Sequence, residues 1–155
     1  MLLLSLLVSV SVWYNDGMKI YFACSIRGGR GDAKTYAELA EYIKSKATLL
    51  TEIFVDNKLT SSGMNKPSSV IWKTDVAWIE ESDAVIAEVT NPSLGVGYEI
   101  AKAEEWHKPT LALFHNDGSR KLSAMIHGSP NTKTVYYTEI SEAKVAIDTF
   151  IKDLL

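Results

Sequence analysis

The stretch from Ala84 to Glu99 constrains the fold more than any other part of the chain, because it combines a strand, a turn and a helix in direct succession. An apolar run is followed by Asn91-Pro92, which ends the strand because proline cannot continue a hydrogen-bonded ladder. Ser93 is suited to cap the next helix, and Gly95 and Gly97 allow a ligand close to its first turn. Free N–H groups at a helix N-terminus favour an anion, so we predict a phosphate-compatible loop here.

Two acidic residues fall on helix faces that should turn inward. Glu99 shares a face with Val96 and Ala103, and Asp75 shares one with Ile79. For either acid alone, a cap to another segment or a rim position is the better explanation. Two such acids beside glycine-bearing loops are typical of acid/base and nucleophilic chemistry on a glycosidic bond.

Composition limits the class of protein. The chain has 155 residues, 46% hydrophobic and 23% charged, which is typical of one domain with a core of its own. Its net charge of −3 and scattered basic residues argue against a nucleic-acid polymer as partner and leave a small anionic ligand open. The single cysteine, Cys24, excludes an internal disulfide framework and indicates a buried, inert thiol in a reducing compartment.

The apolar run from Leu2 to Val12 is too short to span a membrane and has no Lys or Arg before it. The missing positive charge favours an extension outside the fold over a cleaved signal peptide, which stays open. We therefore expect residues 1–17 to be an N-terminal extension and residues 18–155 to form the domain. The expected location is the cytoplasm, with the nucleus as a further compartment.

The domain begins with an aromatic and aliphatic strand, Lys19 to Cys24, that ends in a glycine loop, residues 25–31. This loop matches neither the Walker pattern nor GxGxxG, but its serine, arginine and backbone N–H groups suit a phosphate, while a plain turn with solvated arginines explains it equally well. Asp32 is then expected to cap a helix. The apolar stripe of that helix consists of Tyr36, Leu39, Ala40 and Ile43.

Further strands and helices alternate along the chain. We expect a strand over Thr48 to Val55, a lid or rim loop from Asp56 to Pro67, and a helix opening at Ser68 or Ser69. A buried strand, Pro109 to Phe114, leads to a short semi-helical piece, Lys121 to Gly128, in which Ser123 alone would be an ordinary exposed hydroxyl.

The chain ends in a strand and a helix. The strand covers Lys133 to Thr138, and Ser141 is expected to cap the helix. Its expected inward residues are Val145, Ile147, Phe150, Ile151 and Leu154. The three histidines, His107, His115 and His127, lack ligand spacing, so we predict no metal site.

This alternation predicts an α/β fold: a single doubly wound domain of the flavodoxin or Rossmann kind, with a mostly parallel five-stranded sheet and helices on both faces. Ligands of such sheets bind beyond the carboxyl ends of the strands. The Ser25 and Ser93 loops both follow strands, so they should meet at one crevice, with Asp75 and Glu99 supplied by flanking helices.

Together these residues resemble the 2′-deoxynucleoside 5′-phosphate N-hydrolase family, relatives of the nucleoside 2-deoxyribosyltransferases. The likeness spans Lys19 to Phe150. Its specific segments are Pro92-Ser93-Leu94-Gly95-Val96-Gly97-Tyr98-Glu99 and Leu122-Ser123-Ala124-Met125-Ile126. Supporting segments are Tyr21-Phe22, Ser25-Ile26-Arg27-Gly28-Gly29, Asp75 with Trp78, and Glu88-Val89-Thr90.

The resemblance implies hydrolysis of the N-glycosidic bond of a 2′-deoxynucleoside 5′-monophosphate, without a cofactor and without a stable membrane span. It implies Glu99 as the nucleophile, with Asp75 and Tyr21 as acid/base and orienting partners. Ser123 matches a serine that reaches the phosphate in a neighbouring subunit, which implies a homodimer. The remaining substrate-binding positions are Ser25, Ile26, Arg27, Gly28, Ser93 and Gly95.

The chain departs from the family pattern at Cys24, where members have Gly, and at Ile53, where they have His. These changes bear on base preference and rate rather than on the reaction. Two rival functions stay open: a deoxyribosyltransferase, which would pass the sugar to a second base, and a silent nucleotide-binding module. A phosphate-binding Arg27 argues against the first, and two acids on apolar faces argue against the second.

Overall fold

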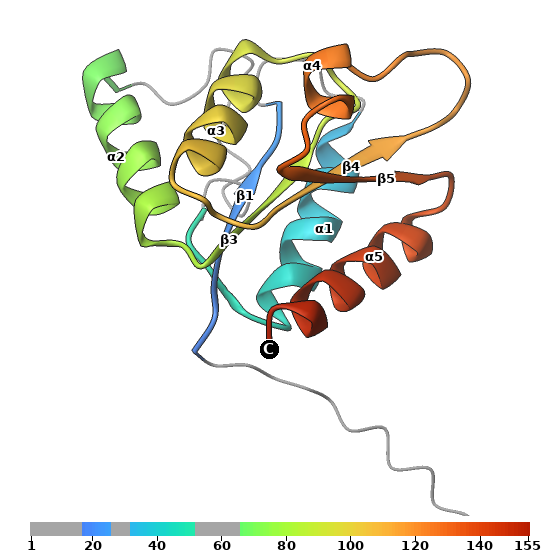
Figure 1. Ribbon diagram of the computed structural model, residues 1–155, viewed down its shortest axis with the longest axis horizontal. Helices are drawn as coiled ribbons and strands as arrows, with labels where there is room; N and C mark the ends of the chain where they lie inside the picture. The colour runs from blue at the N-terminus through green and yellow to red at the C-terminus, as the bar shows by residue number, and fades with distance from the viewer. Residues whose placement is uncertain (1–16, 26–31, 52–65) are drawn as a thin grey trace, which may run out of the picture.

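The computed structural model describes residues 17–25, 32–51 and 66–155. Within them lies a five-stranded parallel sheet, as predicted, and its strand order is β2-β1-β3-β4-β5 (Figure 1). The strands are β1 (Lys19–Ala23), β2 (Thr48–Leu49), β3 (Ala84–Glu88), β4 (Thr110–His115) and β5 (Thr132–Tyr137). The helices are α1 (Ala33–Lys44), α2 (Ser68–Glu81), α3 (Leu94–Glu105), α4 (Ala124–His127) and α5 (Ile140–Asp153).

Some predicted features lie outside the described residues. They include residues 1–16 of the expected extension, Ile26, Arg27 and Gly28 of the glycine loop, Ile53, and most of the predicted lid. No helix in the described ranges is both long and apolar enough to cross a membrane.

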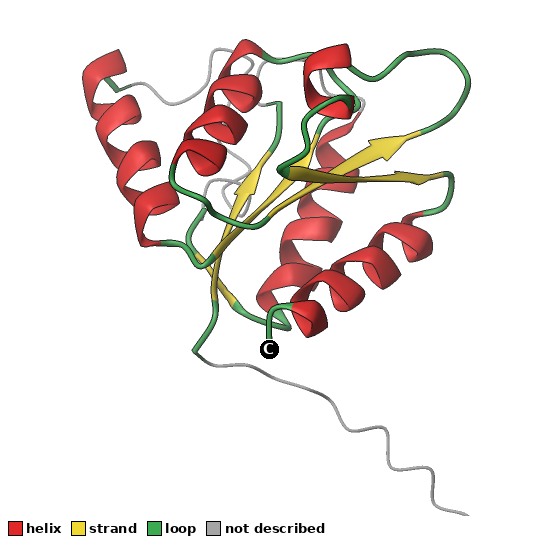
Figure 2. Ribbon diagram, viewed as in Figure 1, coloured by secondary structure: helices red, strands yellow, loops and turns green. Residues whose placement is uncertain are grey.

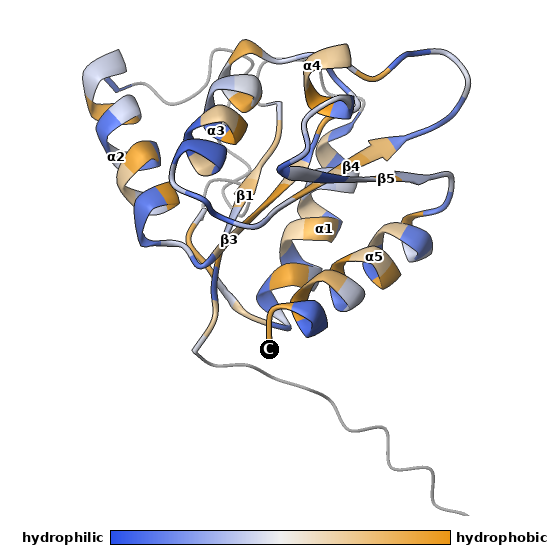
Figure 3. Ribbon diagram, in the orientation of Figure 1, coloured by the Kyte–Doolittle hydropathy of each residue, from blue (hydrophilic) through white to orange (hydrophobic). Residues whose placement is uncertain are grey.

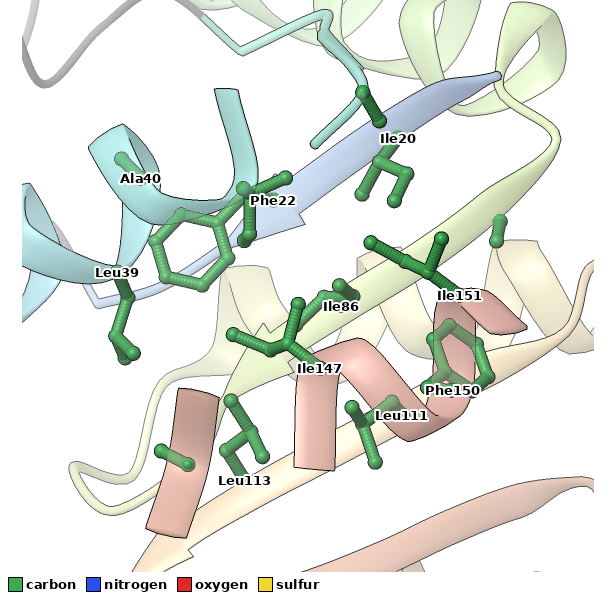
Figure 4. Packing of buried hydrophobic residues seen from close by; sticks show 14 of the residues in the cluster. Ile20, Phe22, Leu39, Ala40, Ile86, Leu111, Leu113, Ile147, Phe150 and Ile151 are labelled. Atoms are coloured by element: carbon green, nitrogen blue, oxygen red, sulfur yellow. The ribbon is translucent and has the colours of Figure 1, made fainter. Parts of the chain in front are cut away.

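The sheet separates two layers of helices (Figures 1 and 2). Helices α1 and α5 cover one face, where Phe22, Leu39 and Ile147 belong to one buried cluster (Figure 4). Helices α2 and α3 cover the other face, where Tyr21 and Ile79 belong to a second cluster. Neighbouring residues of β1 therefore point to opposite faces, as the period of two in a strand requires.

The central strand, β3, is buried along its whole length and is apolar except for Glu88 at its end, which is typical of a parallel sheet covered on both sides. The helices instead carry an apolar and a polar side, visible for α5 in Figure 3. The predicted stripe of α1 is confirmed, since its buried residues are Tyr36, Leu39, Ala40 and Ile43. Helix α2 begins at Ser68, also as predicted.

The second strand is only partly described, because residues 52–55 of the predicted strand lie outside the described residues. Strand β2 lies at the edge of the described sheet and covers Thr48–Leu49, and Leu50 and Thr51 follow it without strand structure. The N–H of Phe22 donates to the Thr51 side-chain Oγ1 at 3.2 Å. A side-chain oxygen thus accepts from the strand backbone at this position.

Two predicted helix caps differ from the structure. Asp32 is the N-cap residue of α1, as predicted, but its side chain makes no cap bond and accepts a hydrogen bond from Asn91 instead. Ser141 lies within α5, which is capped by Glu139 and Glu142 in a reciprocal capping box. The Glu142 carboxylate can bond back to the N-cap N–H, which a serine inside the first turn cannot do.

The inward face of α5 also differs at one position. Val145 is 64% exposed, whereas Ala143 is buried together with Ile147 and Ile151. These three residues follow the four-residue spacing of one helical face, and Val145 is rotated to the far side of it. The prediction that Val145 points inward is therefore wrong.

Candidate active site

A phenol and a carboxylate from different elements meet between the sheet and α3. Tyr21 lies in β1 and points to the face covered by α2 and α3, and Glu99 lies one turn after the buried Val96 in α3. The Tyr21 hydroxyl donates a hydrogen bond to Glu99 Oε1 at 3.0 Å. The predicted inward placement of Glu99 is thus confirmed.

Asp75 lies in α2, which packs against α3. Its Oδ1 is buried and has no hydrogen-bond partner within the described part of the protein. Burial raises the pKa of Asp75 to about 6. An unpaired buried carboxyl oxygen is costly for a folded protein, so a ligand or a proton is expected to satisfy it.

The two carboxyls influence each other. Burial raises the pKa of Glu99 to about 7; the Tyr21 hydrogen bond works against this rise, and the negative charge of Asp75 adds to it. Burial, and then the charges of Glu99 and Asp75, raise the pKa of Tyr21 far above its usual value. Near neutral pH, Tyr21 is therefore a stable hydrogen-bond donor, whereas the two carboxyls hold and release protons.

The turn before α3 has the predicted geometry. Ser93 caps the helix, because its side-chain oxygen accepts a hydrogen bond from the N–H of Val96 at 3.3 Å. A Cβ added at Gly97 would meet no protein atom within 4 Å, and one added at Gly95 would make only ordinary contact with Ser93. Protein packing does not require these glycines, which leaves room for a ligand at the first helical turn.

The remaining predicted site residues are distributed as follows. Ser25 is buried just beyond the end of β1, whereas Ile26, Arg27 and Gly28 lie outside the described residues. Ser123 is exposed at the N-cap of α4. A cavity of about 550 Å³ is lined by Ser93 and Ser123, but not by Tyr21, Asp75 or Glu99. One chain thus brings the two serines to one cavity, whereas the catalytic candidates come from β1, α2 and α3 and do not line it.

A third buried acid escaped prediction. Glu88 ends β3 and is 1% exposed. It accepts hydrogen bonds from the Thr90 N–H at 3.3 Å, from the Thr90 hydroxyl, and from the Tyr137 hydroxyl at 3.0 Å. The available signal was an acid in an otherwise apolar strand, the same signal that marked Glu99. Because its oxygens have partners, Glu88 serves the structure at the end of β3.

Metal binding needs several ligands at one place. In the described ranges, no group of three or more His, Cys, Asp or Glu side chains is arranged to hold a metal ion.

Comparison with known proteins places this geometry in a family. The sequence model of the nucleoside 2-deoxyribosyltransferase family matches residues 20–143, and the chain belongs to that family. Its fold is also that of a CMP N-glycosidase of Clostridium botulinum, which matches with a TM-score of 0.62 at 18% identity over 84% of this chain and 98% of the other.

Curated relatives are more similar in sequence. A protein of Tetraodon nigroviridis named 5-hydroxymethyl-dUMP N-hydrolase is 46% identical over 74% of this chain and 82% of its own length. A protein of Nematostella vectensis named putative 2′-deoxynucleoside 5′-phosphate N-hydrolase 1 is 41% identical over 82% of this chain and 88% of its own length. The resemblance stated from the motifs is confirmed by these matches.

Proposed function

We propose that this protein hydrolyses the N-glycosidic bond of 2′-deoxynucleoside 5′-monophosphates to give the free base and 2-deoxyribose 5-phosphate. The observation that carries the proposal is the Tyr21–Glu99 hydrogen bond of 3.0 Å, together with the buried Oδ1 of Asp75, which has no hydrogen-bond partner among the described residues. The names of the relatives at 46% and 41% identity support the reaction and its substrate class.

In the proposed mechanism, Glu99 attacks the anomeric carbon as a carboxylate and the C1′–N bond breaks. The bonding electron pair leaves with the base, which takes a proton from Asp75. Water then attacks the anomeric carbon, Asp75 accepts its proton, and Glu99 leaves as a carboxylate. Tyr21 holds Glu99 in position by its hydrogen bond. The anomeric configuration is retained because two displacements follow each other.

The phosphate is proposed to bind at the first turn of α3. Ser93 and Gly95 are at that turn, and the N–H groups there attract an anion. Ser25 is the described end of the glycine loop, and Arg27 is proposed to supply the charge-assisted donors. The remaining proposed contacts of that loop are Ile26 and Gly28.

We also propose a homodimer in which Ser123 reaches the neighbouring site. Leu94 and Met125 are 97% and 83% exposed, and both line the cavity that also holds Ser123. Large apolar side chains exposed together are typical of an interface. A second copy of the chain would cover them and bring its own Ser123 with it.

The domain boundary and the compartment are proposals as well. Residues 18–155 would form the hydrolase domain and residues 1–17 an extension. Cys24 is a free, buried thiol whose pKa is raised by burial, so it has little reactivity. A chain with this single inert cysteine suits the reducing cytoplasm or nucleus.

A transferase is the second candidate, because the matching family is described as nucleoside 2-deoxyribosyltransferase. A transferase would use the same attack by Glu99, but a second base would replace water in the next step. The two functions therefore differ in the acceptor.

The experiment is to incubate the protein with deoxynucleoside monophosphates, among them 5-hydroxymethyl-dUMP, and with the matching ribonucleotides and deoxynucleosides. We expect free base from the deoxynucleotides only, since a 2′-hydroxyl would compete for the space that Glu99 needs and a nucleoside lacks the phosphate. Base release that requires an added acceptor base would support the transferase instead.

A further inference from the structure

One buried amide connects the turn before α3 with two other parts of the chain. Asn91 follows β3, is 7% exposed and lines the cavity that also holds Ser93 and Ser123. Its Nδ2 donates to the Asp32 carboxylate and to the Tyr36 hydroxyl, the latter at 3.0 Å. Its Oδ1 accepts from Arg120 Nη1. Both the nitrogen and the oxygen of the side-chain amide are therefore hydrogen-bonded.

The partners of Asn91 determine the orientation of its amide. A carboxylate only accepts hydrogen bonds and a guanidinium only donates them, so the NH₂ group must face Asp32 and the oxygen must face Arg120. Arg120 also lies 3.8 Å from Asp32 Oδ2. Neither a carboxylate nor an apolar side chain at position 91 could satisfy both neighbours, because Asp32 would repel the former and the latter would make no hydrogen bond.

The backbone on which Asn91 sits is itself fixed. Thr90 bonds to the buried Glu88, and its Oγ1 accepts a hydrogen bond from the His115 N–H at 2.7 Å. Residues 88–91 are all buried. Asn91 is thus attached to the ends of β3 and β4, and it can serve as a fixed point for segments that are less tightly packed.

The segments bonded to Asn91 carry the two serines of the cavity. Ser93 follows Asn91 by two residues, and Ser123 follows Arg120 by three, in a stretch without regular structure. Behind Ser123, the hydroxyls of Ser129 and Thr132 donate to Glu104 of α3. Hydrogen bonds therefore hold the segment that carries Ser123 on both sides of this serine. The bond from Arg120 to Asn91 is the one nearer to it in the sequence.

We propose that Asn91 is a positioning residue that holds Ser93 at the phosphate of its own site and Ser123 where it reaches the phosphate in the neighbouring subunit. This inference rests on the proposed function. In the proposed mechanism Asn91 touches no reacting atom. It acts through Arg120 and through the turn before α3, to which it belongs. Its loss should therefore weaken binding of the phosphate and leave the chemical step nearly unchanged.

The first test compares Asn91→Ala and Arg120→Ala with the native protein on one deoxynucleoside monophosphate. We expect each variant to raise KM about tenfold, as for a lost hydrogen bond to a charged group, and to leave kcat within about twofold. The double variant should raise KM no more than the stronger single variant, since both remove the same connection. Additive effects, or an unchanged KM in Asn91→Ala, would overturn the proposal.

A second test exchanges the amide and the carboxylate between positions 91 and 32 and asks whether KM is restored. Asn91→Asp should raise KM because two carboxylates then face each other, and adding Asp32→Asn should restore it because one amide again meets one carboxylate. Failure of Asp32→Asn to restore KM would count against the proposal. Tyr42→Phe is the matched control, because it removes another hydrogen bond between elements, from Tyr42 to Asp148 at 2.7 Å, away from the cavity, and should leave KM unchanged.

Calorimetric titration with 2-deoxyribose 5-phosphate separates this inference from the proposed function. A native protein that releases no base contradicts the proposed function. The effect of Asn91→Ala on the dissociation constant for the sugar phosphate still tests whether Asn91 positions the two serines. We expect that constant to rise about tenfold in Asn91→Ala. An unchanged constant overturns the positioning role whatever the turnover.

Discussion

The Tyr21 hydroxyl lies 3.0 Å from Glu99 Oε1 and donates a hydrogen bond to it, although the two residues are 78 positions apart in the sequence. The bond joins strand β1 to helix α3. It also counteracts the rise in the Glu99 pKa that burial causes. Tyr21 therefore favours the ionised form of Glu99, the form that can act as a nucleophile.

Tyr21→Phe tests this bond. Without the donor, the pKa of Glu99 should rise further above about 7, so the acid limb of kcat/KM should move to higher pH. We expect kcat to fall roughly 10- to 100-fold because Glu99 also loses its orientation. Tyr137→Phe is the control, since it removes a bond of the same length to Glu88. Equal effects in both variants would contradict a specific role for Tyr21.

The pH profile of the native protein should be bell-shaped. The active form has Glu99 ionised and Asp75 protonated. Because the pKa of Glu99, about 7, lies above that of Asp75, about 6, this form is the minor one of the two singly protonated forms and is most populated between the two pKa values. Activity should therefore be highest near pH 6 to 7 and fall on both sides. The measurement is kcat/KM from pH 4 to 9.

Asp75→Asn provides the control for that profile. It should lose the alkaline limb, because an amide has no proton to release in this range, and it should keep the acid limb that the ionisation of Glu99 causes. Ionisation of the substrate phosphate affects native protein and variant alike, so it cannot explain a limb that only the native protein shows. An alkaline limb that persists in Asp75→Asn would refute the assignment of Asp75 as proton donor.

Stability should respond to pH through the same two acids. Both acids have a higher pKa in the folded protein than in the unfolded chain. Between its unfolded and its folded pKa, each acid therefore binds more protons in the folded state. The stability they contribute is complete below about pH 4 and is lost as the pH rises through about 6 and 7. The free energy of unfolding should accordingly fall from pH 5 to pH 8.

Glu99→Gln isolates one of these groups. The amide is neutral at every pH and its oxygen can still accept the Tyr21 bond, so the variant should gain roughly 2 kcal/mol over the native protein at pH 8 and little at pH 5. Denaturant unfolding at both values is the measurement. Glu80→Gln on the exposed side of α2 should change stability at neither pH. A Glu99→Gln variant less stable at pH 8 would disprove the proposed cost of the buried charge.

The dimer is tested at the exposed apolar residue next to Ser123. Met125→Asp would put a charge into the proposed interface, so we expect monomers in sedimentation and a KM raised about tenfold. Ser123→Ala should raise KM while the protein remains a dimer. A native protein that is a monomer with full activity would exclude the composite site.

Much of the fold could be predicted from the sequence. Helical periodicity identified the buried stripe of α1 and the inward faces that carry Asp75 and Glu99, and the apolar run of β3 marked a strand of the sheet. These features depend on residues near each other in the chain. The hydrogen bond between the Phe22 N–H and the Thr51 side chain could not be predicted, because it forms only when two distant segments meet.

In the site, too, features that depend on contacts between distant residues could not be predicted from the sequence. The pattern of an acid on an apolar background is present at Asp75, Glu99 and Glu88 alike, although the prediction used it only for Asp75 and Glu99. Only tertiary contacts separate them, since Glu88 is bonded by Thr90 and Tyr137 whereas an oxygen of Asp75 has no partner in the described part of the chain. Connections such as Arg120 to Asn91 likewise arise only when distant segments pack together.

The most direct test of the account is the stereochemistry of methanolysis. The protein is incubated with a deoxynucleoside 5′-monophosphate in water containing methanol, and the methyl glycoside is assigned by NMR. Attack by Glu99 followed by attack of methanol predicts release of the base and a methyl glycoside of retained configuration, and no base release by Glu99→Gln. A glycoside of inverted configuration, or full base release by Glu99→Gln, would contradict the central role of Glu99.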